Sequence, residues 1–351
     1  MKIRLSCFIG ILCGFIWFGG GRASAWDYEG HNIINQLALA SLPTNFPAFA
    51  MAPAARERIA FLAGEPDRWR NTPDLALRHV NTPDHYIDLE DLSACGLAPE
   101  TLPPLRYDFV AQLALVRAAH PEKFPPIDPD KNLDHTRQLT GFLPWTITEY
   151  YAKLKSEFSY LKTFEEAGGT PEEIANAQAN VIYTMGVMGH FVGDATQPLH
   201  TTIHFNGWMG ENPHHYTTNR TFHPWIDGGY ISKVNVAGDL GEMKKKLHPA
   251  HIVTLNNQNV QPEEMFQAAV IFIQEQNKLV EPLYQLEKEG RLSGEGELGL
   301  QGKPFIEGQL VKAGQMLGDI WYSAWQQAPE DVYLKRWLEA RRTEKTNVDK
   351  K

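Results

Sequence analysis

Apolar residues recur at three- and four-residue spacing along most of the chain, which is the pattern of helices that bury one face. Segments that alternate between polar and apolar positions, as half-buried strands do, are not convincing anywhere. The predicted helices span residues 30–42, 106–119, 145–166, 174–195, 263–283 and 305–326. The sequence therefore predicts an all-α fold, organised as a single large helical domain.

Turn-forming residues predict where these helices are interrupted. Thr170, followed by proline and glutamate, is typical of a helix start. Residues 201–222, rich in glycine, asparagine, histidine and threonine, are predicted to form a long ordered loop. Residues 284–303 are predicted to connect two late helices, and residues 343–351 to form a disordered tail.

The first 25 residues have the composition of a secretory signal peptide. A basic start precedes an apolar run, and the small residues Ala23-Ser24-Ala25 form a cleavage site. Cleavage there would make Trp26 the first residue of the mature chain. We therefore expect a secreted or periplasmic protein whose folded domain spans residues 26–342.

The charge balance argues against wide contact with a nucleic-acid duplex. The chain has 33 basic and 42 acidic residues, a formal net charge of −9, and signal cleavage would remove three more positive charges. One phosphate could still bind, because divalent metals make a site locally positive. Of the three cysteines only Cys95 lies beyond the signal, so packing or metal, rather than disulfides, must stabilise the fold.

Histidines and aspartates occur at spacings that suit metal binding. His190 and Asp194 are four residues apart, so on a helix both side chains project from one face, and His200 follows shortly after. His223 and Asp227 repeat the four-residue spacing. Each pair alone is explained by an ordinary helical contact. Several such pairs in an apolar setting favour metal binding, because buried charges must be paired or bound to metal.

Three glycines, Gly186, Gly189 and Gly193, lie in the same helical segment as the first pair. Glycine is a poor helix former and costs up to ~1 kcal/mol relative to alanine. Their presence predicts that other parts of the chain pack closely against this helix.

Two further motifs precede this segment. Asp67 lies one helical turn before Arg70, and His85, Tyr86 and Asp88 lie in one short run. A helix cap or a surface position would explain Asp67 or His85 taken alone. A phosphate contact and a surface salt bridge explain Arg70 equally well.

Taken together and in order, these residues resemble the zinc-dependent nuclease and phospholipase C superfamily, and most closely its S1/P1 nuclease branch. The resemblance rests on Trp26-x4-His31, Asp67, His85-Tyr86-Ile87-Asp88, His190-x3-Asp194-x5-His200 and His223-x3-Asp227. It implies a helical domain built around a trinuclear zinc cluster.

The resemblance also implies which residues bind each ion. The first zinc would be held by Asp67, His85, His190 and Asp194, the second by His200, His223 and Asp227, and the third by the α-amino group and carbonyl of Trp26 with His31 and Asp194. Zinc lowers the pKa of bound water to ~7, so the implied reaction is phosphodiester hydrolysis by a zinc-activated hydroxide. Asp67 would orient the water, and Arg70 would contact the phosphate.

The expected function is that of a secreted zinc-dependent nuclease that hydrolyses single-stranded nucleic acid, with 3′-nucleotides as further substrates. Tyr86 would stack on a base and Asp88 would accept hydrogen bonds from base edges, although Tyr86 could equally fill the wall beside the ligands. The alternatives are a phospholipase C that uses the same ions to release a phosphorylated headgroup, and a non-catalytic secreted zinc-binding protein. No stable protein partner is expected.

Overall fold

The computed structural model describes residues 26–124, 126–255 and 258–348, so the predicted signal peptide lies outside the described residues. Helices make up 68% of the chain. Within the described part, the strands are β1 (Thr254–Leu255) and β2 (Gln258–Asn259), which pair antiparallel with Thr254 opposite Asn259. The predicted all-α fold is confirmed.

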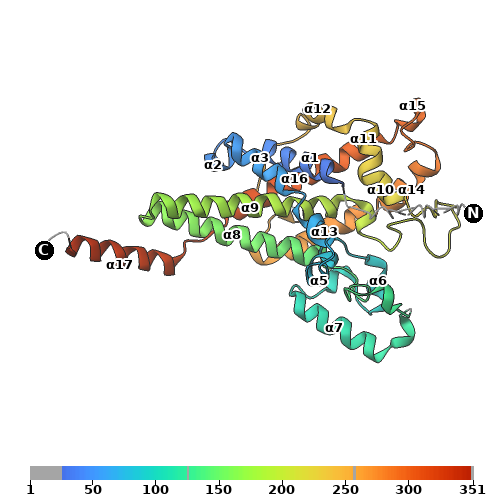
Figure 1. Cartoon of the computed structure of the whole chain (residues 1–351), viewed down its shortest axis with the longest axis horizontal. Coiled ribbons are helices and arrows are strands. Elements are labelled where there is room, and N and C mark those ends of the chain that lie inside the picture. The colour runs from blue at the N-terminus through green and yellow to red at the C-terminus, as the bar shows by residue number, and fades with distance from the viewer. Residues whose placement is uncertain (1–25, 125, 256–257, 349–351) are drawn as a thin grey trace, which may run out of the picture.

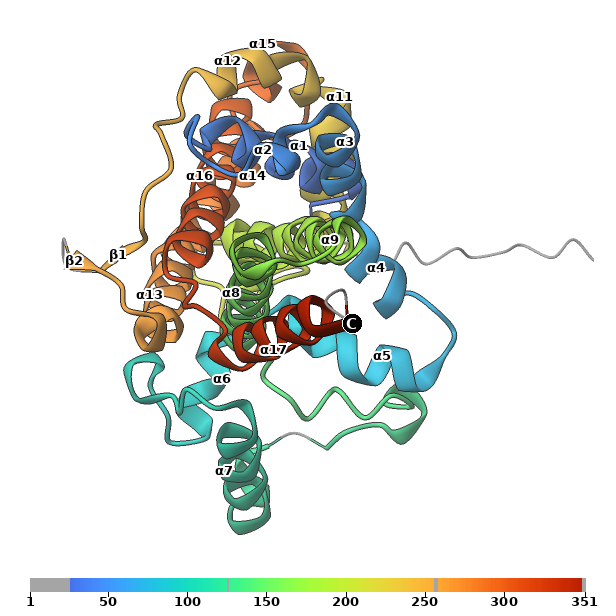
Figure 2. The same cartoon turned by 90° about the vertical axis from the view of Figure 1, so that its left-hand side faces the viewer.

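Four long helices from distant parts of the chain form the centre of the molecule (Figure 1). α1 (Tyr28–Ser41) packs along α16 (Lys303–Gln326), and α8 (Leu143–Ala167) packs along α9 (Pro171–Thr196). α9 also contacts α1 and α16, so the two pairs share one apolar core. The view in Figure 2 shows α1 on one side of α9 and α8 on the other.

The other helices surround this centre. They are α2 (Ala48–Met51), α3 (Pro53–Leu62), α4 (Glu65–Arg70), α5 (Leu75–Asn81), α6 (Leu89–Ala94), α7 (Arg106–Ala119), α10 (Phe222–Pro224), α11 (Ile231–Lys233), α12 (Leu240–Lys244), α13 (Met265–Asn277), α14 (Val280–Lys288), α15 (Gly296–Gly299) and α17 (Val332–Val348). Single turns of tighter or wider helix are η1 (Thr82–His85), η2 (Pro99–Thr101), η3 (Pro121–Lys123), η4 (Pro129–Lys131), η5 (Pro198–His200), η6 (Trp225–Tyr230), η7 (Val236–Asp239) and η8 (Pro262–Glu264). No helix in the described part of the chain is both long enough and apolar enough to cross a membrane.

The predicted helices are observed within a few residues of their expected bounds, with one exception. The segment predicted as one helix over 263–283 forms two, α13 and α14, which are separated at Lys278 and Leu279. At this break the side-chain amide of Asn277 donates a hydrogen bond to the carbonyl of Thr201, which ties the turn to the loop after α9. α14 continues to Lys288, so the predicted connector over 284–303 begins later than expected.

Two further expectations concern the ends of elements. The hydroxyl of Thr170 accepts a hydrogen bond from the backbone of Glu173, whose carboxylate accepts one in return, so the predicted start of α9 is confirmed. α17 extends to Val348, so the structure has a helix where a disordered tail was predicted from residue 343. Residues 349–351 of that tail lie outside the described part of the chain.

The glycines of α9 allow close contact with neighbouring side chains, as predicted. A Cβ atom at Gly189 would lie 1.7 Å from Oδ1 of Asn35, and one at Gly193 would lie 2.8 Å from Nδ1 of His31. Asn35 uses this approach to donate hydrogen bonds to backbone carbonyls of α3 and α9. α1, α3 and α9 are therefore joined at fixed spacing beside the candidate site.

Candidate metal centre

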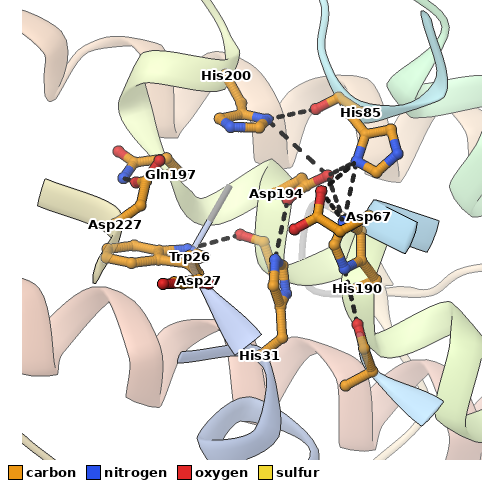
Figure 3. A network of polar contacts seen from close by, with 12 residues as sticks. Trp26, Asp27, His31, Asp67, His85, His190, Asp194, Gln197, His200 and Asp227 are labelled. Atoms are coloured by element: carbon orange, nitrogen blue, oxygen red, sulfur yellow. Dashed lines mark hydrogen bonds and ion pairs between the residues drawn. The ribbon is translucent and has the colours of Figure 1, made fainter. Parts of the chain in front are cut away.

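The predicted side-chain ligands meet at the C-terminal end of α9 (Figure 3). They come from separate elements: His31 from α1, Asp67 from α4, His85 from η1, His190 and Asp194 from α9, His200 from η5, His223 from α10 and Asp227 from the π-helical turn η6. All of these side chains are buried except that of Asp67, which is largely buried. The fold therefore brings together residues that the sequence places far apart.

Asp194 is the centre of the arrangement. Its Oδ1 atom lies 3.4 Å from Nε2 of His31. Its Oδ2 atom lies 3.0 Å from Nδ1 of His85, 3.5 Å from Nε2 of His190 and 3.9 Å from Nδ1 of His200. The two oxygens of one carboxylate thus face different sets of histidines.

Among the predicted ligands, three groups of atoms are compact enough to hold metal ions. They are His31 with His190 and Asp194; Asp67 with His85 and His190; and His200 with His223 and Asp227, and within each group the ligand atoms lie within 4.8 Å of one another. The first two groups share His190. The imidazole rings of His31 and His190 are stacked, with 3.8 Å between their centroids. The chain therefore has buried His/Asp groups that could hold metal ions.

The spacing of these atoms fits metal coordination. Two ligand atoms that each lie ~2.0–2.1 Å from a tetrahedral zinc ion are separated by ~3.3 Å. Nδ1 of His85 lies 3.0 Å from Oδ2 of Asp194 and 3.9 Å from Oδ1 of Asp67. Nε2 of His190 lies 3.5 and 3.7 Å from the same two oxygens. Imidazole nitrogens and carboxylate oxygens in this arrangement suit zinc and similar divalent ions.

Backbone carbonyls orient two of the imidazole rings. Nδ1 of His190 lies 2.7 Å from the carbonyl oxygen of Ala63, and Nδ1 of His200 lies 2.5 Å from that of His85. Because a carbonyl oxygen only accepts hydrogen bonds, the proton of each neutral ring is on Nδ1. The lone pair of each Nε2 atom can then bind a metal, and Nε2 of His190 lies 2.9 Å from Nδ1 of His85, another predicted ligand atom.

Several buried ligand atoms lack a hydrogen-bond partner among the described residues. They include Nε2 of His200, Nε2 of His85 and Nδ1 of His223, whereas Oδ2 of Asp227 lies 2.8 Å from Nε2 of His223. A buried polar atom without a partner costs about 1–3 kcal/mol. Metal coordination would remove this cost, which explains why such atoms are collected in one place.

Burial controls the protonation of the cluster. It lowers the pKa of His190 to about 3 and the pKa of His85 well below its ordinary value, and the positive charge of Arg70 acts in the same direction. Burial likewise raises the pKa of Asp194. Neutral imidazoles are the form that binds metals, and a bound cation would return Asp194 to its charged form.

Arg70 is paired with a predicted metal ligand. Its Nε atom lies 2.8 Å from Oδ1 of Asp67, one turn earlier in α4, and the two side chains are only 12% and 13% exposed. The pair is therefore not the exposed surface salt bridge considered as an alternative from the sequence. After burial, the positive charge of Arg70 is a further cause that lowers the pKa values of His85, His190 and His200.

Trp26 is buried beside the same cluster (Figure 3). Its indole Nε1 atom donates a hydrogen bond of 2.9 Å to the carbonyl of Gly193, next to Asp194. The backbone N–H of Asp27 donates one of 3.0 Å to the carbonyl of Asp227. These bonds hold the backbone of Trp26 near two predicted ligands, whereas chelation by its α-amino group and carbonyl stays a prediction.

Tyr86 and Asp88 lie on an extended segment that follows η1. The backbone N–H of Ile87 donates to the carbonyl of His200, and that of Asp88 donates to the carbonyl of Thr140, so neighbouring segments support both sides. Burial, followed by the negative charge of Asp88, raises the pKa of Tyr86. Burial also raises the pKa of Asp88. The role of both residues in substrate binding stays a prediction.

Gln197 contacts a predicted ligand, although the sequence did not predict a role for it. Its side-chain amide donates a hydrogen bond of 2.5 Å to Oδ1 of Asp227, and its Oε1 atom accepts one from the backbone of Leu199. Gln197 thus orients a predicted metal ligand without being one. Its position between Asp194 and His200 was the available signal.

Phe205, an aromatic residue in the loop after η5, was likewise not predicted from the sequence. The Phe205 side chain is 42% exposed, and its ring centroid lies 6.2 Å from that of His223. Nearby Trp208 instead stacks on His204 at 3.9 Å and meets Tyr284 edge-on. Phe205 is therefore the aromatic side chain of this group that is both exposed and beside a predicted ligand.

Comparisons with known proteins identify no relative of this chain. The chain matches no family model, and searches of curated proteins and of solved structures give no match. The metal centre therefore rests on the geometry of the chain's own residues.

Proposed function

We propose that the chain is a secreted zinc-dependent phosphodiesterase of the S1/P1 nuclease type, which hydrolyses single-stranded nucleic acid and 3′-nucleotides. The observation that supports this most is the position of Asp194. One of its oxygens faces His31, whereas the other faces His85 and His190. A carboxylate used in this way can serve two adjacent ions.

The proposed cluster holds three zinc ions. The first is assigned to Asp67, His85, His190 and Asp194, the second to His200, His223 and Asp227, and the third to Trp26, His31 and Asp194. When bound, such ions supply Lewis acidity and lower the pKa of water, which is the chemistry that phosphodiester hydrolysis requires.

The protein side chains would orient the substrate around this cluster. Arg70 brings a planar cationic group beside Asp67, and a guanidinium suits the two-oxygen recognition of a phosphate. The ion pair of 2.8 Å between its Nε atom and Oδ1 of Asp67 would keep that carboxylate oriented. Tyr86 would stack on one base, with Asp88 accepting hydrogen bonds from the base edge.

The number of ligands favours catalysis over metal storage. Structural zinc sites are closed by four protein ligands, whereas catalytic sites keep one position open. The second group has three side chains, His200, His223 and Asp227, and the proposed third site depends on the shared Asp194. The side chains are therefore too few to close all three sites.

The test compares substrates on a chain that starts at Trp26. Zinc per chain is measured together with hydrolysis of heat-denatured DNA, native duplex DNA and phosphatidylcholine vesicles. We expect denatured DNA to be cleaved in preference to native duplex DNA and vesicles. The control variant Asp194→Asn should be inactive on all three substrates. Cleavage of vesicles but not DNA would replace the nuclease proposal with the phospholipase C alternative. A zinc-loaded chain inert towards every phosphodiester would support the non-catalytic alternative.

A further inference from the structure

A second cluster of histidines lies outside the proposed active centre. His248 and His251 are exposed and belong to the segment between α12 and β1, and the buried Asp319 comes from α16. One ligand atom from each of the three lies within 4.8 Å of the other two. Nε2 of His251 is 3.9 Å from Oδ2 of Asp319. None of these residues belongs to the cluster around Asp194.

Both rings are oriented by neighbouring carbonyls. Nδ1 of His248 lies 3.3 Å from the carbonyl oxygen of Pro249, and Nδ1 of His251 lies 2.9 Å from that of Ile252. Since these oxygens only accept, each neutral ring carries its proton on Nδ1. The Nε2 lone pairs are left for another partner, which is the arrangement found in metal-binding histidines. The rings are stacked, with 5.2 Å between centroids and 7° between planes.

α16 holds this segment in place through one row of side chains. The backbone N–H groups of His248, His251 and Val253 donate to side-chain oxygens of residues at four-residue intervals on α16, which are Gln315, Asp319 and Ser323. Residues at this spacing lie on one helix face. The two histidines are thus presented together by backbone bonds rather than by chance contact of flexible side chains.

The two oxygens of Asp319 have different environments. Oδ1 accepts hydrogen bonds from the backbone of His251 and from the side-chain amide of Gln315, both at 3.0 Å. Oδ2 is the oxygen that faces the imidazole of His251. A ligating carboxylate that is oriented by hydrogen bonds to its other oxygen is typical of a metal site.

We propose that His248, His251 and Asp319 form a separate surface site for a divalent transition-metal ion, and that Zn²⁺ is the ion it takes. Two imidazoles and one carboxylate form a three-ligand set that leaves a coordination position towards solvent. Nitrogen ligands of this kind do not suit Ca²⁺ or Mg²⁺, which prefer oxygen. The bound ion would clamp the segment between α12 and β1 onto α16.

The experiment counts ions on the full chain. Wild type, the double variant His248→Ala/His251→Ala and the control His214→Ala/His215→Ala are dialysed against micromolar Zn²⁺, and zinc per chain is measured. His214 and His215 are exposed neighbours, and they belong to no candidate ligand group in the described part of the chain. We expect the first double variant to bind one ion fewer than wild type, with unchanged hydrolysis, and the control to match wild type. Asp319→Asn should weaken binding at least about tenfold.

A second measurement does not depend on folding of the variants. In wild type, Zn²⁺ titration should shift the imidazole Nε2 NMR signals of His248 and His251 while both Nδ1 atoms keep their protons. Equal zinc content in wild type and the His248/His251 variant would overturn the proposal. So would unmoved Nε2 signals, or an equal loss of zinc in the His214/His215 control.

Discussion

The Nε2 atom of His31 lies 3.4 Å from Oδ1 of Asp194, so this histidine approaches a different oxygen from that approached by His85, which lies 3.0 Å from Oδ2. A carboxylate has lone pairs on both oxygens and can therefore bridge two ions. Asp194 is fully buried, and its pKa is raised by that burial. Burying a charged carboxylate costs free energy unless the charge is compensated, so we expect substitution of Asp194 to have a large effect.

Asp194→Asn should remove two ions and abolish phosphodiester hydrolysis. The amide keeps the size of the side chain but loses the charge and one of the two ligating oxygens. Zinc per chain and turnover of denatured DNA are the measurements. Asp227→Asn is the matched comparison, because Asp227 belongs only to the group with His200 and His223 and should cost one ion. Full zinc content and retained turnover in Asp194→Asn would refute the bridging role.

A residue placed before Trp26 should remove the third ion. Trp26 and Asp27 are held by bonds to Gly193 and Asp227, so their position does not depend on a free amino group. The proposed chelate does depend on it, because an amide nitrogen is not a comparable ligand. A chain that starts at Trp26 is compared with one that carries a single additional alanine. Equal zinc content in the two chains would exclude the chelate.

Gln197→Ala should weaken the second site selectively. Gln197 donates to Oδ1 of Asp227, and partners of this kind typically change metal affinity by about 10–100-fold when they are removed. Competition with a chelator measures the affinity of each ion. The weakest-bound ion of the variant should be the one assigned to His200, His223 and Asp227. An unchanged affinity would mean that Gln197 has a packing role only.

Substrate selectivity tests Tyr86 and Phe205. Stacking on a base contributes about 1–3 kcal/mol of binding free energy. Tyr86→Ala should therefore raise the KM for oligonucleotides far more than the KM for a small generic phosphodiester. Phe205→Ala tests the exposed ring beside His223 in the same assay. Tyr107→Ala serves as the control, because Tyr107 is exposed on α7 and absent from the candidate site. Equal losses on both substrates would assign Tyr86 to the wall of the site.

The stability of the chain should depend on pH through Glu157. Burial raises the pKa of this α8 residue to about 7 from an ordinary value of 4.5, although a hydrogen bond from Thr184 opposes the shift. The stability contributed by the neutral acid is present below pH 4.5 and is lost as the pH rises through 7. Glu157→Gln stays neutral, so it should be more stable than wild type at pH 8 and equal to it near pH 4.5.

Urea unfolding of wild type and Glu157→Gln across this pH range makes the comparison. Glu165→Gln is the control, since Glu165 is exposed on the same helix. A stability difference between Glu157→Gln and wild type that does not change with pH would show that folding does not raise the pKa of Glu157.

The sequence predicted the helices well because their apolar periodicity is local. The four-residue spacing of His190 and Asp194 was likewise enough to place both side chains on one face of α9. The break between α13 and α14 was not predictable, because it is fixed by a hydrogen bond from Asn277 to the distant Thr201. The helix at the chain end was missed because α17 continues through a polar segment that lacks a strong apolar pattern.

The same distinction applies to the candidate site. Ligand types could be read from the sequence, whereas the residues that orient them could not. The carbonyl of Ala63 orients His190 across 127 positions of sequence, and no side-chain pattern marks a carbonyl. The cluster of His248, His251 and Asp319 was missed for a related reason, because α16 supplies its carboxylate from 68 positions away.

The most direct test of the account is zinc per chain on protein that starts at Trp26, measured together with hydrolysis of denatured DNA. The protein carries the substitutions His248→Ala and His251→Ala, so that zinc bound at the surface site does not add to the measured zinc content. We predict three zinc ions per chain and cleavage of the DNA. Fewer than two ions would contradict the ligand assignment and the function that depends on it.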